Sequence, residues 1–510
     1  MSRKEKVLHS TMLVTLVIIL SKAIGFGRDM VTTAYFGRTM ENDAYVSAYS
    51  LFYLPVLLFN SCISATLIPM YVSERQKYSL KYSNRFASNA INLFALLALV
   101  VSAVMFALAE PLVRLVYRGF PADKIALTAK LVRIMVLALA FNVTSITVSN
   151  MLNAMEKYIA AQLTGFPLSV CVIVASVAFS GRFGIAAVAW GVFAANILQL
   201  LVLIPFLKGW FHYTPELNLR DRRFKKLAKL ALPAMLSMGV SELNHMIDHA
   251  LASGLAEGTL TSMTSAYRLI TFLQGILIVP LTTIMFSKMS VKVAKNDERG
   301  ALNMLKRSAI TLSLVVLPIV GIGAVLSVDV IKFAYMRGKF TLEDVNVTAG
   351  ILLFYIVGLP AFGMRDFLSR MFHALKDTKT PFRVSCMVVG INIVLNFILR
   401  AVMGANGLAF ATSIAGYCGT IALVLLLRRR FGRIGLRKTA REFGKILFST
   451  AVCVVVCIGM NRVIPDAVGT FKVTLRLALC AGVALIAYVA CGLAVRVRLL
   501  RRFARRVLKR

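Results

Sequence analysis

Long apolar stretches alternate with short polar segments along the whole chain. About fourteen of these stretches reach the roughly 20-residue length that an α-helix needs to cross a bilayer. None shows the sustained period-2 alternation that is typical of a membrane β-barrel strand. The pattern therefore predicts an all-α polytopic membrane protein with about 14 transmembrane helices. Their approximate centres are Ile24, Leu58, Val100, Leu139, Ile173, Ala194, Val240, Ile276, Val316, Val357, Ile391, Ala415, Val455 and Ala484.

Short patterns from the first half of the chain recur in the second half at a nearly constant offset. "VSAYSL" (46–51) resembles "TSAYRL" (264–269), and "VYRGF" (116–120) resembles "YMRGKF" (335–340). Further matches follow in the same order at the same offset of about 220 residues. Each match is weak alone, but an ordered series at one offset indicates an internal duplication.

The duplicated unit contains six predicted helices, so both copies have the same orientation in the membrane. Such parallel repeats are related by an axis along the membrane normal, with substrate sites between the lobes and alternating access by rocking. We therefore expect a transporter with two six-helix lobes. The predicted domains are an amino-terminal lobe at 1–210, a carboxyl-terminal lobe at 225–430, two additional transmembrane helices at 440–497 and a basic cytoplasmic tail at 498–510.

Composition and charge support a membrane protein and indicate its orientation. Hydrophobic residues make up 58% of the chain and charged residues only 16%, against roughly a quarter charged in soluble proteins. Most of the 59 Lys and Arg lie at the two termini and in the loops on the same side, which predicts that both termini are cytoplasmic. The net charge of +37 favours anionic membrane lipids as partners. Nucleic acid is not expected, because no basic domain exists outside the apolar stretches.

The stretch "SKAIGFGRD" (21–29) places three charges inside the first predicted helix. Each ionised residue at a bilayer centre costs about 2.5–3.5 kcal/mol on insertion scales, so such residues are functional candidates. Lys22 and Asp29 share one helical stripe, with Arg28 beside it. Asp43 opens the second helix. Arg268 lies in the eighth helix, where the repeat counterpart is the uncharged Ser50.

Several cations facing a cavity between two lobes would suit an anionic substrate such as a pyrophosphate, which Arg and Lys bind through charge-assisted hydrogen bonds. Lys22, Arg28 and Arg268 are the candidate substrate-binding residues, and Asp29 and Asp43 are candidates for gating or charge pairing. Two structural alternatives stay open. Arg28 can pair with Asp29 to lock helices together, and Lys22 can extend to the membrane interface.

Two further clusters carry titratable groups. Arg365, Asp366 and Arg370 in the tenth predicted helix are candidates for gating or for structural pairing. In "SELNHMIDHA" (241–250), Glu242 and Asp248 are candidates for coupling to sodium or protons, and structural hydrogen bonding between helices is the alternative. The histidines of this stretch have metal-like spacing, but no third group of ligands accompanies them, so no metal site is expected.

At these residues the sequence resembles the MurJ (MviN) lipid II flippases of the multidrug/oligosaccharidyl-lipid/polysaccharide (MOP) exporter superfamily. The resemblance rests on "SKAIGFGRD", "DAYVSAYSL" (43–51), "SAYRLITFLQGIL" (265–277) and "FHALKDTKTP" (372–381), and it covers essentially the whole chain. The first motif is fairly specific and the others are less so.

The resemblance implies a function and a location. The substrate would be lipid II, the undecaprenyl-pyrophosphate-linked disaccharide-pentapeptide precursor of peptidoglycan, moved to the outer leaflet of the bacterial cytoplasmic membrane. Family arginines in the first, second and eighth helices line the central cavity, which by position implies Lys22, Arg28 and Arg268 here. Asp29 and Asp43 match family acids, and the last two helices form a groove for the lipid tail. No cofactor is implied, and the protein is expected to be monomeric.

The sequence departs from this family at two positions. Lys22 stands where the family usually has arginine, which keeps the charge but loses the bidentate guanidinium. "LFYLPVLLFN" (51–60) is uncharged where the family's second-helix arginine is expected. These departures keep another polyprenyl-pyrophosphate-linked oligosaccharide open as the substrate.

Other function classes fit the sequence less well. A cation-coupled drug exporter would need acids in the cavity rather than cations. An integral-membrane glycosyltransferase or phosphatase would need carboxylate pairs or a histidine in a sizeable loop, and no such loop is found. We therefore expect a transporter and not an enzyme. The energy source stays open between the membrane potential and a sodium or proton gradient.

Overall fold

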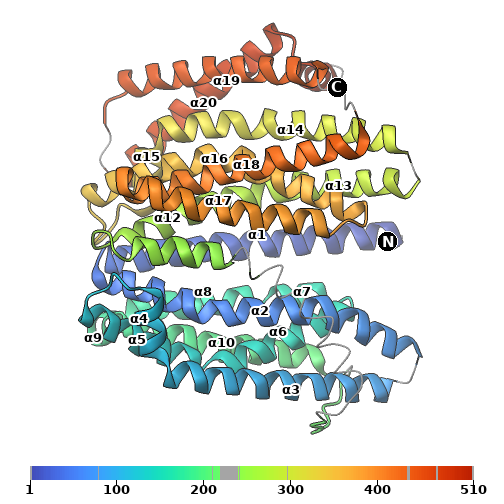
Figure 1. The fold of residues 1–510 in the computed structure, drawn as a ribbon, viewed down its shortest axis with the longest axis vertical. Coiled ribbons are helices and arrows are strands. Elements are labelled where there is room, and N and C mark those ends of the chain that lie inside the picture. Colours follow the sequence, from blue (N-terminus) through green and yellow to red (C-terminus); the bar gives the residue numbers. More distant parts are fainter. Residues whose placement is uncertain are drawn as a thin grey trace. The chain divides into compact units, whose positions relative to one another are not determined.

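The structure, a computed structural model, describes residues 3–77, 80–209, 211–218, 239, 242–295, 297–432, 437–466 and 469–507. Every regular element in these ranges is a helix (Figure 1). The all-α prediction is therefore confirmed. Apolar side chains cover much of the helix surface, as expected when the surrounding solvent is lipid.

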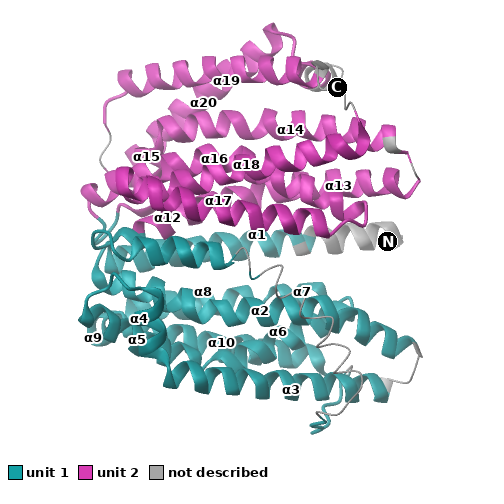
Figure 2. Ribbon diagram, viewed as in Figure 1, with its two compact units in different colours: residues 1–261, 337–340 teal, residues 262–336, 341–510 magenta. Residues whose placement is uncertain are grey.

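The chain divides into two compact units (Figure 2). Unit 1 comprises Met1–Thr261 and Arg337–Phe340, and unit 2 comprises Ser262–Met336 and Thr341–Arg510. The short segment 337–340 thus packs with unit 1 although its neighbours in sequence belong to unit 2. The lobe limits expected from the repeat, 1–210 and 225–430, stay a prediction.

Unit 1 is built mainly from long apolar helices with short connections. Its elements are α1 (Arg3–Phe36), α2 (Met40–Lys77), α3 (Leu80–Ala107), α4 (Ala109–Val116), α5 (Ala122–Val136), α6 (Leu139–Ala154), α7 (Tyr158–Gln162), α8 (Gly165–Val174), η1 (Ala175–Phe179), α9 (Ser180–Phe183) and α10 (Ala186–Leu207). Helix α1 is continuous through its two internal glycines. These glycines therefore do not break the first helix.

Unit 2 continues the same architecture. Its elements are α12 (Thr259–Leu273), which begins within unit 1, η2 (Gln274–Ile278), α13 (Val279–Ala294), α14 (Glu298–Val325), α15 (Ser327–Tyr335), α16 (Leu342–Ala374), α17 (Lys379–Met403), α18 (Ala405–Phe431), α19 (Arg437–Val463), α20 (Thr470–Ala494) and α21 (Arg498–Val507). Local sequence explains where α16 begins. Thr341 and Asp344 form a reciprocal capping box at the start of α16.

The spans agree with the prediction wherever the structure can be compared with it. Eleven helices in the described part are long and apolar enough to cross a membrane, and the bent pair α5–α6 adds a twelfth. These twelve correspond to twelve of the fourteen predicted centres. The predicted centre at Ile24 lies in helix α1, and the centre at Val240 lies outside the described residues. The chain is thus a multi-pass membrane protein.

The cysteines lie in different environments. All eight are free thiols. Cys453, Cys457 and Cys480 are buried in one hydrophobic cluster between α19 and α20, as small apolar side chains would be. Cys386, by contrast, is exposed. A small apolar side chain on a spanning helix gains little from burial, because lipid is as apolar as the interior of the protein.

The duplication is visible in matching tertiary contacts. In unit 1 the Tyr117 hydroxyl donates a hydrogen bond to the Ser47 carbonyl oxygen at 3.3 Å. In unit 2 the Tyr335 hydroxyl donates to the Ser265 carbonyl oxygen at 3.2 Å. Both members of the second pair lie 218 residues after their counterparts in the first. The repeat read from the sequence therefore preserves side-chain contacts as well as sequence.

Candidate functional site

The stretch 21–29 lies on helix α1, where small residues let the neighbouring helix approach closely. A Cβ atom added at Gly165 of α8 would collide with the Ser21 hydroxyl, and one added at Gly25 would lie 3.8 Å from the Ser169 hydroxyl. Small residues are the usual device for close helix packing in membranes. Gly165 of α8 thus permits the close approach of α1 at Ser21, while Gly25 makes only an ordinary contact.

The charges of this stretch differ in their surroundings. The guanidinium of Arg28 donates to the Asp29 carboxylate through Nε at 3.0 Å and through a terminal nitrogen at 2.9 Å. The two side chains are only 15% and 12% exposed. Lys22 is exposed. Arg28 therefore presents a partly neutralised, largely buried charge, whereas the ammonium of Lys22 is accessible.

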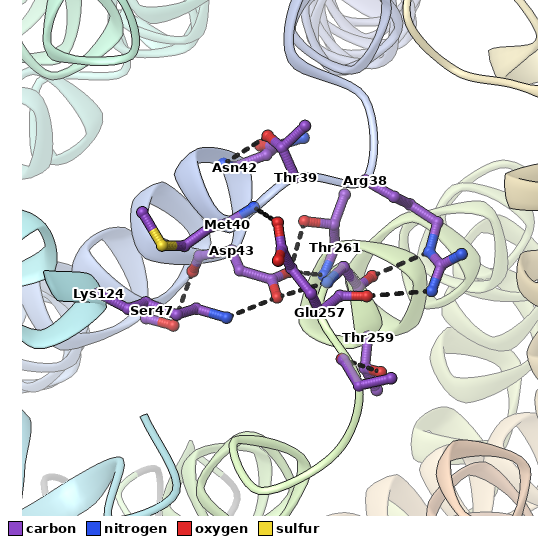
Figure 3. A network of polar contacts seen from close by, with 12 residues as sticks. Arg38, Thr39, Met40, Asn42, Asp43, Ser47, Lys124, Glu257, Thr259 and Thr261 are labelled. Carbon is purple, nitrogen blue, oxygen red and sulfur yellow. Dashed lines mark hydrogen bonds and ion pairs between the residues drawn. The ribbon is translucent and has the colours of Figure 1, made fainter. Parts of the chain in front are cut away.

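Asp43 is the centre of a buried polar network, shown in Figure 3, that joins three segments of unit 1. Its carboxylate accepts hydrogen bonds from the Lys124 ammonium at 2.8 Å, the Gly258 amide at 2.9 Å and the Thr261 amide at 2.8 Å. The Thr261 hydroxyl adds a fourth bond at 2.7 Å. Asp43 and Lys124 are 1% and 5% exposed. We call these four residues the Asp43 network.

Further hydrogen bonds hold the same turn next to the Asp43 network (Figure 3). The Met40 amide donates to the Glu257 carboxylate at 2.6 Å. The Arg38 guanidinium donates to the carbonyl oxygens of Glu257 and Gly258 at 3.2 and 3.3 Å. Gly258 has a φ of +77°, a conformation that residues with a Cβ rarely adopt. The turn before α12 is therefore held against the start of α2 by hydrogen bonds to charged side chains, by hydrogen bonds of the backbone and by the conformation of Gly258.

Two close backbone contacts flank this network. A Cβ atom added at Gly119 would collide with the backbone of Gly254, and one added at Gly338 would collide with the carbonyl of Ala34. The Lys339 amide also donates to the Ala34 carbonyl oxygen at 2.8 Å. Only glycine permits such approaches. The "RGF" and "RGKF" copies of the repeat thus make equivalent contacts.

Sequence reasoning missed most partners of Asp43. The sequence pattern singles out none of Lys124, Arg38, Glu257 and Thr261. One available signal was the offset of the repeat, because Asp43 and Thr261 occupy equivalent positions 218 residues apart. Equivalent positions near a repeat axis are expected to meet.

The candidates in the seventh and eighth helices lie in different environments. Asp248 is 2% exposed, and Glu242 is half-buried in the helix formed by residues 242–252. Arg268 is half-buried on α12, where its carbonyl oxygen accepts a bond from the Thr271 hydroxyl at 2.9 Å. Among the described residues, no group of three or more His, Cys, Asp or Glu side chains is arranged to hold a metal ion.

Helix α16 carries the second charged cluster. The Arg370 guanidinium donates to the Asp366 carboxylate at 3.0 Å, one helical turn away. The Thr282 hydroxyl of α13 donates to the same carboxylate at 3.4 Å. Arg365 lies against α18, where its Cδ would be 3.3 Å from a Cβ added at Gly419. The pair Asp366–Arg370 thus links two helices of unit 2.

Beyond the end of α16, Asp377 caps the next helix. Its carboxylate accepts bonds from the Thr380 amide at 3.0 Å and the Thr380 hydroxyl at 2.7 Å. These hydrogen bonds, with weaker attraction from Arg430, lower the pKa of Asp377 below its usual value. This arrangement matches a structural helix cap rather than a substrate site.

Unit 2 contains a further charge cluster, centred on the buried Arg476, that the sequence did not reveal. Arg476 of α20 pairs with Asp329 of α15 at 3.0 Å and with Asp466 at 2.7 Å. It also donates to the Asn461 side chain at 2.8 Å. The Arg476 side chain is 6% exposed. This cluster fastens the two carboxyl-terminal spanning helices to the rest of unit 2.

Comparisons with known proteins identify the family. A family model described as "Lipid II flippase MurJ" matches residues 32–479. The probable lipid II flippase MurJ of Thermotoga maritima is 30% identical and covers 84% of this chain and 86% of its own length. The corresponding protein of Rhizobium tropici is 28% identical over 85% of this chain and 83% of its own length.

Solved structures show the same fold. A structure described as lipid II flippase MurJ in an inward closed conformation superposes with a TM-score of 0.81 at 25% identity, covering 96% of this chain and all of that one. An inward-facing multidrug resistance MATE transporter of the MOP superfamily gives 0.71 at 14% identity over 83% of this chain. The sequence-based resemblance is confirmed: the chain belongs to the MurJ family of lipid II flippases.

Proposed function

We propose that this protein moves lipid II from the cytoplasmic to the outer leaflet of the bacterial inner membrane by alternating access. The observation that carries the proposal is the family match, which covers residues 32–479 and so nearly every spanning helix. Membership of this family makes the chain a transporter and not an enzyme. Lipid II, a polyprenyl-pyrophosphate-linked disaccharide-pentapeptide, is the substrate.

Lys22, Arg28 and Arg268 bind the pyrophosphate in this proposal. Arg28 is paired with Asp29, as in the structural alternative, and in this proposal Asp29 holds the guanidinium in one orientation and lowers the cost of a cation within the membrane. Lys22 contributes an accessible ammonium. Arg268 adds a charge that the duplication does not explain, since its counterpart is Ser50.

The Asp43 network closes one end of the transport path in this proposal. It joins the starts of α2, α5 and α12, which begin the second, fourth and eighth predicted spans, and all even-numbered spans begin at the same membrane face. With cytoplasmic termini, that face is the outer one. Asp366 and Arg370 serve as a second pairing that changes with conformation, and Arg365 lies beside them.

No cofactor is required, and the energy comes from the membrane potential or from a sodium or proton gradient. Moving one charge through 100 mV is worth about 2.3 kcal/mol, so a cationic site can respond to the potential directly. Glu242 and Asp248 are the candidate coupling groups. Flipping measured while each gradient is collapsed in turn distinguishes these sources.

Anionic membrane lipids are partners of unit 2 in this proposal, and the protein acts as a monomer. A cavity of about 310 Å³ between α14, α19 and α21 is lined by Lys306, Arg307, Arg498 and Arg502. The Glu442 carboxylate in its wall lies 3.4 Å from the side chains of both Lys445 and Arg498. The excess positive charge at the membrane surface suits a lipid phosphate.

Complementation of a strain that lacks its peptidoglycan flippase tests the proposed function. We expect growth to be restored and lipid II to appear in the outer leaflet. Growth failure with a well-expressed, correctly inserted protein would overturn it. A flippase for another polyprenyl-linked oligosaccharide is the second candidate, favoured by Lys22 and the uncharged segment 51–60. Accumulation of a different lipid-linked glycan on depletion would support that candidate.

A further inference from the structure

Unit 1 contains a polar cavity inside its bundle of spanning helices. The cavity has a volume of about 260 Å³ and lies between α2, α6, α8 and α10. Its polar lining includes Asn60, Asn142, Ser145, Asn150, Asn196 and Gln199. Polar side chains are expensive at membrane depth and are functional candidates there. Their convergence on one cavity needs an explanation beyond helix packing.

Asn142 leaves one strong acceptor unused in this cavity. Its amide nitrogen donates to the Asn196 side-chain oxygen at 2.5 Å, and Asn196 in turn donates to the Val192 carbonyl oxygen at 2.7 Å. The Asn142 side-chain oxygen is buried without a hydrogen-bond partner, and the residue is only 9% exposed. An unpaired buried acceptor is costly. The linked amides of Asn142 and Asn196 thus form part of the polar wall of the cavity.

The cavity lining indicates the chemical class of a ligand. None of the described residues that line it is charged, so the ligand is neutral and polar. Amide side chains supply both donors and acceptors, as a polyhydroxylated group requires. Two tyrosines of the lining, Tyr49 and Tyr53, stack at 5.9 Å with an interplanar angle of 12°. Aromatic rings beside planar amides are a general arrangement for binding sugars, whose C–H faces contact the rings.

The position of the cavity relates it to the proposed pyrophosphate site. Helix α1, which carries Arg28, contacts α2 and α8, two of the helices that line the cavity. Tyr45, Tyr49 and Tyr53 follow one another along α2, with ring centroids 6.1 and 5.9 Å apart. Eight residues of helix span about 12 Å, which is comparable with the length of a disaccharide. A substrate with its phosphate near Arg28 would thus extend its sugars along α2 toward Asn142.

We propose that this cavity binds the neutral carbohydrate of the lipid-linked substrate, with Asn142 and Asn196 as hydrogen-bonding groups and Tyr49 and Tyr53 as the stacking surface. The proposal rests on the proposed function, because it assumes a glycan attached to a polyprenyl pyrophosphate. It assigns specificity for the sugar to unit 1. A volume below the roughly 300 Å³ of drug-sized sites fits a single sugar unit.

The test compares lipid II, which carries the disaccharide-pentapeptide, with undecaprenyl pyrophosphate, which carries neither sugar nor peptide. The full-length protein and its variants are titrated in detergent with lipid II and with undecaprenyl pyrophosphate, and Kd is measured for each. Asn142→Leu removes the unpaired acceptor and its bond to Asn196. We expect a loss of about threefold to tenfold in affinity for lipid II, the usual worth of a hydrogen bond. Affinity for the sugar-free lipid should not change.

Matched variants keep the test decisive. Gln199 is half-buried and lines the same cavity. If Asn142→Leu fails to fold, Gln199→Leu takes its place and should also lower the affinity for lipid II. Asn153→Leu, on the same helix but outside the cavity, should leave both affinities unchanged. Equal losses for both lipids, or no loss for lipid II, would overturn the sugar site. Failure of the unmodified protein to bind either lipid would instead overturn the proposed function.

Discussion

Replacing Asp43 with alanine is the most direct test of the Asp43 network. The substitution removes an acceptor of four hydrogen bonds, with donor–acceptor distances between 2.7 and 2.9 Å. It also leaves the ammonium of Lys124, which is 5% exposed, without its carboxylate. We expect the turn before α12 to separate from the start of α2 much more often than in the unmodified protein.

The magnitude follows from the burial of the pair. Removing one member of a buried ion pair costs about 3–5 kcal/mol, because the other charge stays buried. The Lys124 ammonium lies 4.2 Å from the centroid of the Phe120 ring, and this cation–π contact offsets part of the loss. A net cost near 3 kcal/mol raises the open fraction roughly 10²-fold, since 1.4 kcal/mol is tenfold in an equilibrium constant.

A thiol probe at Thr259 measures this opening. Thr259 is 5% exposed and lies within the fastened turn, so Thr259→Cys in a cysteine-free background reacts with a soluble thiol reagent only when the turn opens. Asp43→Ala should accelerate labelling by about two orders of magnitude. Adding Lys124→Met should recover most of the difference, because the orphaned charge is then gone. Asp123→Ala, an exposed acid beside Lys124, is the control.

Two results would refute this reasoning. One is an unchanged labelling rate in Asp43→Ala, which would mean that the carboxylate does not hold the turn. The other is a double variant, Asp43→Ala with Lys124→Met, whose change in labelling rate equals the product of the changes caused by the two single substitutions. Independent sites behave in that way, whereas directly paired groups do not.

Three further outcomes are expected. Arg268→Ala should abolish complementation of a flippase-deficient strain while Arg268→Lys retains part of it, because the ammonium keeps the charge but not the bidentate geometry; full growth with alanine would exclude the residue from the site. Gly119→Ala should lower the thermal stability of the purified protein, since its Cβ meets facing backbone, whereas Gly390→Ala, with open space around its Cβ, should not; equal melting temperatures would contradict the close contact. Lys306→Gln combined with Arg307→Gln should reduce the stabilisation given by phosphatidylglycerol vesicles relative to phosphatidylcholine vesicles, and an unchanged difference would argue against the cavity at α14 and α19.

The spans and the duplication were predictable because their signals are local or periodic. Apolar runs of helix length identify membrane helices directly, since the bilayer requires every backbone group to be satisfied within the segment. The repeat added a fixed offset, and the paired contacts Tyr117–Ser47 and Tyr335–Ser265 follow it. Both features can be recognised in the sequence without any knowledge of the tertiary structure.

The partners of the candidate charges were not predictable in the same way. Lys124 lies 81 residues from Asp43, so no local pattern links the two. Arg28 and Asp29 form an ion pair although adjacent positions on a helix do not normally face each other. Long side chains can bend toward a neighbour within a low-polarity environment, where an unpaired charge is costly. This pairing was one of the structural alternatives that the sequence left open, and the structure shows it.

The neutral polar cavity escaped sequence analysis for a related reason. Charges stand out within apolar stretches, but Asn142 and Asn196 change the mean hydropathy of their helices little. They also lie 54 residues apart, on α6 and α10, so no local pattern links them. Only packing brings their side chains together, and only packing shows that one acceptor lacks a partner.

The location of Asp43 relative to the repeat explains why its charge occurs only once. Asp43 and Thr261 are counterparts in the two copies, and they bind each other. Contacts of this kind arise near a twofold axis, where equivalent residues meet. A carboxylate in both copies would place two like charges within hydrogen-bond distance and destabilise the contact. One copy therefore keeps the acid and the other supplies donors, so the two copies of the repeat have diverged at this contact.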